Sequence, residues 1–293
     1  VRPHFNLTAA GSDVLNAARP SALPQDEKSR AYANSVAHFL LAMATAGVPP
    51  VIVFGSLLAL VRGQDLSATG DVDFVAFHRH LKLEKILRPL RGAGFKHEVN
   101  GWPRHPGFEV SFWPGLPKAP VIDLFLATEG YDNYAISLWD TEGKVTLCQL
   151  PGPAEFVPVT YYGWGLPVVF FMSATAVFDV SWVYGPHWRV PDKKWRWYES
   201  KRRANIQYCN VSARMGRRAV MQAPVPILGV WDLPLRRLRK LSRLYFETEA
   251  NMRNLRALAE PRGEAGRPAA LAEDTGGAGP TAAKAARPGR LWR

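Results

Sequence analysis

Cysteine is scarce in this sequence. The 293 residues include two cysteines, Cys148 and Cys209, and seven histidines. Two cysteines so far apart form no disulfide framework, and neither lies at the short spacing of a zinc-binding pair. The composition therefore excludes a small disulfide-stabilised scaffold and a cysteine-based zinc fold.

Acidic residues are also in the minority. The chain has 25 Asp and Glu against 37 Lys and Arg, which gives a formal net charge of +12 and a pI near 9.9. Such an excess of positive charge favours acidic partners. Phosphorylated small molecules, nucleic acid and anionic membrane surfaces all satisfy this requirement.

Long uninterrupted apolar runs are absent as well. Residues 36–61 are almost uncharged, but Gly47, Pro49 and Pro50 interrupt them, which disfavours a membrane-spanning helix. At 47% hydrophobic, the chain can bury one large core or two small ones.

Two aspartates stand out in an otherwise apolar segment. Residues 71–77 read Asp-Val-Asp-Phe-Val-Ala-Phe, the pattern of a buried strand. Side chains alternate along a strand, so Asp71 and Asp73 face the same side, with Cα atoms roughly 6.5–7 Å apart. Two like charges on an apolar strand are costly without a cation. Hard oxygen ligands without His or Cys suit Mg²⁺ or Mn²⁺.

A Gly-Ser pair precedes these aspartates. We predict a short strand at 51–54, a turn at Gly55 and Ser56, and a helix at 57–61. Glycine permits a close backbone approach, and N–H groups at the start of a helix can bind phosphate. The same pair is also an ordinary helix cap.

A third acidic residue, Asp123, lies within the apolar run Val121-Ile122-Asp123-Leu124-Phe125-Leu126. Burial of an uncompensated carboxylate is expensive. Asp123 is therefore either a satisfied structural residue at a strand end or, as we expect, a third ligand beside Asp71 and Asp73.

Together these motifs resemble the LicD/fukutin family of phosphotransferases. The resemblance lies in Phe54 to Leu58, in Val61-Arg62-Gly63 and in Asp71-Val72-Asp73. A later segment, 184–191, matches the family's Tyr-Gly-x-x-Trp-x-x-Pro element. The similarity extends over about residues 30 to 195. It implies a nucleotidyltransferase-like α+β fold, with a mixed sheet flanked by helices.

The chain departs from the family pattern at one place. The family has a Pro-Trp-Asp segment before the paired aspartates, whereas this chain has Leu66-Ser67-Ala68-Thr69-Gly70. The upstream acidic residue is thus missing, which resembles the fukutin branch more than the bacterial choline-phosphate branch.

The resemblance implies transfer of a phospho-alcohol or phospho-sugar, such as choline phosphate or ribitol phosphate, from a CDP-linked donor to a glycan or glycoprotein hydroxyl. It assigns Mg²⁺ or Mn²⁺ to Asp71, Asp73 and Asp123, with Asp123 also a candidate to orient or deprotonate the acceptor. It assigns the donor phosphates to Gly55, Ser56 and Arg62, although Arg62 could equally form a surface salt bridge. Tyr184 and Trp188 are expected to support the fold, or else to touch substrate.

Four regions are expected along the chain. They are an irregular lead-in at 1–24, the nucleotidyltransferase-like domain at 25–195, a basic and partly helical extension at 196–260, and a disordered tail at 261–293. Other predicted elements are helices at 26–46, 81–93, 173–183 and 236–258, strands at 95–99, 108–113 and 121–126, and a hairpin at 156–168.

Beyond Pro191 the chain mixes cations with aromatics, as in Lys193-Lys194-Trp195-Arg196-Trp197-Tyr198 at the start of the extension. A solvated basic face explains this pattern, and so does a surface for anionic membrane or for nucleic acid. We expect no specific nucleic-acid partner.

Two other functions use the same residues. One is a nucleotidyltransferase that adds a nucleotide to RNA or a small molecule. The other, suggested by the missing upstream acid, is a catalytically inactive binding module. Because the sequence starts at Val1, we expect any signal or anchor to precede it. The compartment is then the Golgi or secretory lumen for a eukaryotic protein and the cytoplasm for a bacterial one.

Overall fold

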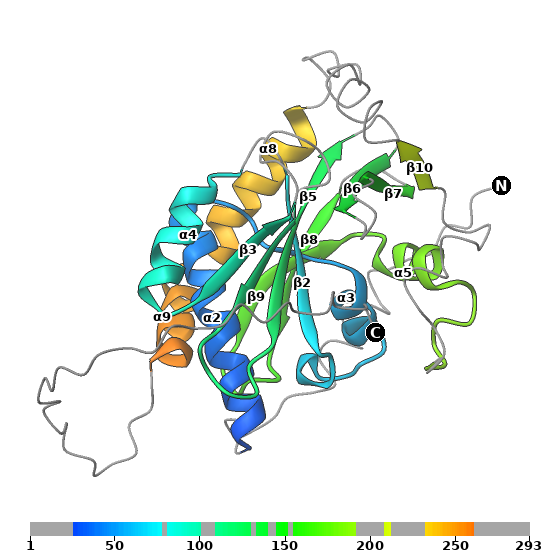
Figure 1. Ribbon diagram of the computed structural model, residues 1–293. Coiled ribbons are helices and arrows are strands. Elements are labelled where there is room, and N and C mark those ends of the chain that lie inside the picture. Colours follow the sequence, from blue (N-terminus) through cyan, green and yellow to red (C-terminus); the bar gives the residue numbers. More distant parts are fainter. Residues whose placement is uncertain are drawn as a thin grey trace, which may run out of the picture.

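The protein has the predicted α+β architecture, with a mixed sheet flanked by helices (Figure 1). The computed structural model describes residues 26–77, 81–100, 109–129, 133–139, 145–151, 155–191, 208–211 and 232–260. Ten strands form one sheet in the order β10-β7-β6-β5-β2-β1-β9-β8, while β4 pairs with β5 and β3 pairs with β4.

The strands are β1 (Val51–Ile52), β2 (Asp71–Phe77), β3 (Lys96–Asn100), β4 (Glu109–Trp113), β5 (Val121–Glu129), β6 (Asn133–Trp139), β7 (Val145–Pro151), β8 (Phe156–Tyr161), β9 (Val168–Ser173) and β10 (Tyr208–Val211). The helices are α2 (Glu27–Ala46), α3 (Phe54–Val61), α4 (Leu83–Gly92), α5 (Ala176–Tyr184), α8 (Asp232–Leu241) and α9 (Glu249–Ala259). A 3₁₀ turn at Leu66–Ala68 and a π-helical turn at Ser242–Phe246 complete them. Strands β6, β7 and β10 were not predicted from the sequence.

Helix α2 has a capping residue at each end. The Asp26 side chain accepts a hydrogen bond from the Ser29 amide at 2.8 Å, and Gly47 ends the helix with a left-handed φ of 65°. Its buried face packs on the sheet, where Phe39 stacks on Phe74 of β2 at 5.2 Å. None of the helices in the described ranges has the length and apolar character that a membrane crossing requires.

Helices cover both faces of the sheet. Figure 1 shows α2, α4, α8 and α9 on one face and α3 with α5 on the other. The first face is closed by aromatic and aliphatic packing around α2. The α3 face carries the aspartates, because they alternate along β2 with the residues that pack against α2.

The C-terminal helices share the core with the rest of the fold. The Asn34 side chain on α2 donates to the carbonyl oxygens of Leu258 and Ala259 at 3.1 and 2.8 Å. The Asn251 side chain accepts from the Val169 amide of β9 at 2.8 Å. The helical part of the segment predicted as an extension therefore packs against the predicted domain. The lead-in, the aromatic–basic run 193–198 and the tail 261–293 lie outside the described residues.

Candidate metal centre

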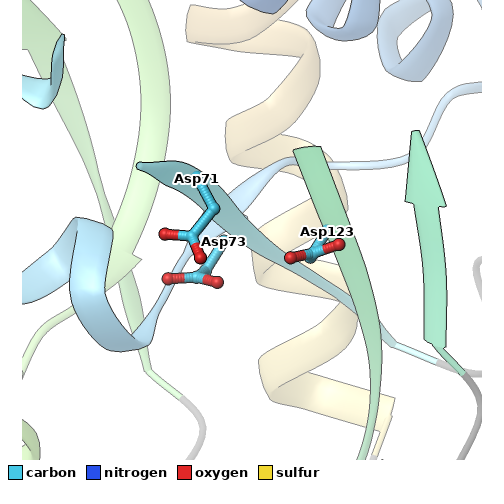
Figure 2. A group of neighbouring side chains, drawn as sticks. All are labelled: Asp71, Asp73 and Asp123. Carbon is cyan, nitrogen blue, oxygen red and sulfur yellow. The ribbon is translucent and has the colours of Figure 1, made fainter. Parts of the chain in front are cut away.

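Three aspartates converge at neighbouring strands of the sheet. β2 and β5 pair in parallel with Asp73 directly opposite Asp123, and Asp71 lies two residues before Asp73 on the same face. One carboxylate oxygen from each of the three lies within 4.8 Å of the others. Figure 2 shows the carboxylates of Asp71 and Asp73 side by side next to β2, and that of Asp123 on the neighbouring strand β5. The structure thus brings together the three residues predicted as metal ligands.

Burial gives this cluster unusual electrostatics. Asp73 and Asp123 are 7% and 3% exposed, and Asp71 is half-buried. Burial raises the pKa of Asp73 well above its usual value, and the neighbouring charges of Asp71 and Asp123 raise it further. Burial also raises the pKa of Asp71. Within the described ranges, no Lys, Arg or His forms an ion pair with Asp71 or Asp73. An all-oxygen, acidic site of this kind suits a hard divalent cation.

Ser56 holds Asp73 in place. The Asp73 amide donates to the Ser56 hydroxyl at 2.9 Å, and the Ser56 amide donates to Asp73 Oδ2 at 3.3 Å. The Ser56 side chain is completely buried. The serine of the Gly-Ser pair therefore orients a candidate ligand, a role that the sequence did not predict. Its contact with donor phosphate stays a prediction.

A strained residue starts helix α3. The helix begins at Phe54, three residues earlier than predicted, and Phe54 has a left-handed φ of 47°. This conformation costs about 1–3 kcal/mol in a residue other than glycine. The buried Phe54 ring packs edge-to-face on Phe125 of β5 at 5.3 Å, which helps to hold this conformation. The turn places Gly55 so close to the cluster that a Cβ there would lie 3.3 Å from Asp73 Oδ2.

The segment that departs from the family pattern fixes the start of β2. The Thr69 hydroxyl lies 2.6 Å from the Asp71 carbonyl oxygen, and the Tyr32 hydroxyl donates to the same oxygen at 3.0 Å. The two hydroxyls are 2.7 Å apart. In place of an upstream acid, this chain has neutral groups that hold the Asp71 backbone.

Arg62 links α3 to the segment at 184–191. Its Nε donates to the Trp188 carbonyl oxygen at 2.7 Å, and its Nη2 donates to the Val190 carbonyl oxygen at 3.2 Å. Trp188 itself is 5% exposed, as expected of fold support. The Tyr184 hydroxyl lies near Gly55, 4.0 Å from the position that a Cβ would take there. Because the Arg62 nitrogens already donate to the carbonyl oxygens of Trp188 and Val190, phosphate binding by Arg62 stays a prediction.

Replacing Arg62 by methionine should lower the free energy of unfolding by about 1–3 kcal/mol, because charged hydrogen bonds to two carbonyl oxygens are lost. Urea unfolding measures this loss. The matched control is Arg91→Met, which removes an exposed arginine whose 3.8 Å ion pair with Glu84 contributes little. Unchanged stability in Arg62→Met, together with weaker nucleotide binding, would instead identify Arg62 as a phosphate ligand.

Sequence reasoning missed one acidic residue near the cluster. Glu109 is the first residue of β4 and is 2% exposed. The sequence contained a pattern that could have identified Glu109. It is a lone glutamate among Phe108, Val110 and Phe112, just as Asp123 is a lone aspartate in an apolar run.

Comparisons with known proteins give no family for this chain. None of the known protein-family models matches it, and neither does any curated protein. The proposed function therefore depends on the geometry of the site.

Proposed function

We propose that this protein is a metal-dependent phosphotransferase with a nucleotidyltransferase-like core. The observation that carries the proposal is the convergence of Asp71, Asp73 and Asp123 on adjacent parallel strands. The resemblance of the Gly-Ser and Asp-x-Asp motifs to the LicD/fukutin family supports it. In this proposal, a phospho-alcohol or phospho-sugar moves from a CDP-type donor to a glycan hydroxyl.

The three aspartates would hold Mg²⁺ or Mn²⁺. When bound there, the cation would neutralise charge on the phosphoryl oxygens and on the departing CMP. The chain's own residues perform the positioning. The Ser56 amide donates to the Asp73 carboxylate, and the Ser56 hydroxyl accepts from the Asp73 amide. Thr69 and Tyr32 fix the Asp71 backbone.

The donor diphosphate is assigned to the first turn of α3. Gly55 lies there, facing Asp73 Oδ2, and its missing side chain leaves the approach open. The N-terminal end of a helix favours negative charge. The Tyr184 hydroxyl lies near Gly55, and we expect it to contact the donor or the acceptor.

Thermal stability across a nucleotide panel tests this proposal. With Mg²⁺ or Mn²⁺ present, CDP or CMP should raise the melting temperature by about 5 °C or more at a hundredfold excess over Kd. The shift should vanish without metal and in Asp71→Asn. A shift with ATP or UTP alone would support nucleotide addition instead. The absence of any shift with metal or nucleotide would contradict both enzymes and support a binding module.

A further inference from the structure

Glu109 lies on the same face of the sheet as the three aspartates. β4 pairs antiparallel with β5, so that Ser111 lies opposite Asp123 and Glu109 lies opposite Phe125. Opposed residues share a face, and the Phe125 ring packs on Phe54 at the start of α3. Glu109 is thus the diagonal neighbour of Asp123, with Cα atoms about 7–8 Å apart. A glutamate side chain is long enough to cover that separation.

The charge of Glu109 is compensated only in part, by a hydrogen bond with the Ser111 side chain. The residue is 2% exposed, and its Oε1 atom is buried without a hydrogen-bond partner in the part of the chain that the structure describes. No Lys, Arg or His in those ranges forms an ion pair with it. Burial raises the pKa of Glu109 to about 8, and the charge of Asp123 adds to the effect. A buried carboxylate oxygen without a partner is costly, so a role as a cation ligand is a physical explanation for its presence.

We infer that Glu109 is a fourth carboxylate of the cation site and binds a hard divalent cation on the Asp123 side. This inference rests on the proposed function, to which it adds a ligand from a third strand. The cation would satisfy the unpartnered Oε1 atom and offset the repulsion between Glu109 and Asp123. Carboxylate oxygens from three adjacent strands would then surround the site.

Glu98 offers a matched control on the same hairpin. It lies on β3 opposite Ser111, in the same row as Asp123, but its side chain is exposed. The substitutions Glu109→Gln and Glu98→Gln therefore remove one negative charge each from neighbouring positions. The two glutamates differ in burial and in their distance from the aspartates.

Binding of Mn²⁺ to the purified chain, followed by the electron paramagnetic resonance signal of the free ion, tests the inference without an activity assay. Glu109→Gln should raise the Kd for Mn²⁺ at least about tenfold, whereas Glu98→Gln should leave it unchanged. Circular dichroism and the metal-free melting temperature show that each variant folds. The metal-free melting temperature of Glu109→Gln should rise at alkaline pH, because a buried charge is removed.

Two results would overturn the inference, and they are distinguishable. If Asp71→Asn abolishes Mn²⁺ binding while Glu109→Gln binds as tightly as the wild-type chain, then Glu109 is a structural carboxyl and the proposed function stands. If the wild-type chain binds no Mn²⁺ at millimolar concentration, both the inference and the proposed cation site fail.

Discussion

Asp71→Asn and Asp73→Asn should each abolish phosphotransfer while the fold remains intact. Asparagine preserves the size of the side chain but loses the charge and one ligand oxygen. A bound cation supplies several kcal/mol of charge stabilisation. Each 1.36 kcal/mol corresponds to a factor of ten, so a loss of about a thousandfold or more is expected. Release of CMP from a CDP-linked donor measures the rate.

The same variants should be more stable than the wild-type chain when metal is absent. Asp71 and Asp73 share a buried face, and each raises the cost of ionising the other. Removing either charge relieves that repulsion, so the metal-free melting temperature should rise and its response to Mn²⁺ should disappear. Glu98→Gln, at an exposed position, should change neither quantity. Full, metal-dependent transfer in either aspartate variant would contradict the assignment of the ligands.

The metal-free protein should lose stability as the pH rises. Folding raises the pKa of Asp71, Asp73 and Glu109, so between the unfolded and folded values the folded state binds more protons than the unfolded state. The free energy of unfolding therefore decreases with pH in that window. The usual pKa of a glutamate is 4.5, and that of Glu109 is about 8. From about pH 6.5 to about pH 9, Glu109 alone should remove about 2 kcal/mol.

A saturating divalent cation should reverse this trend, because the cation binds the ionised carboxylates and competes with protons. Urea unfolding at a series of pH values, in EDTA and in Mg²⁺, measures both profiles. Glu109→Gln should flatten the metal-free profile by its own share, whereas Glu98→Gln, whose exposed charge contributes less to the raised pKa of Glu109, should flatten it less. A metal-free profile without slope above pH 6.5 would contradict the buried, uncompensated state of the cluster.

Local patterns predicted much of the fold. The helical spacing of apolar residues in 26–46 and the stop at Gly47 predicted α2 almost to the residue, because both are local signals. The apolar residues in 71–77 predicted β2, and the alternation of side chains along a strand predicted the shared face of Asp71 and Asp73. The later strands β6, β7 and β10 have weaker patterns and were not predicted.

The roles of Ser56 and Arg62 could not be predicted. The motif assigned both residues to phosphate. In the structure, the Ser56 hydroxyl accepts a hydrogen bond from the Asp73 amide. Two Arg62 nitrogens donate to the carbonyl oxygens of Trp188 and Val190. These partners are 17 and 126 or more residues away along the chain. No local pattern specifies contacts over such separations.

The sequence by itself determined that carboxylates would be buried in apolar strands, and that Asp71 and Asp73 would point the same way. Asp123 was predicted as a third ligand, but only the tertiary structure decided the register that sets it opposite Asp73 and sets Glu109 diagonally opposite Asp123. Strand order and register set those positions, and both depend on how the whole sheet packs against α2 and α3. The identity of each acid is local information, but the site that they form together is not.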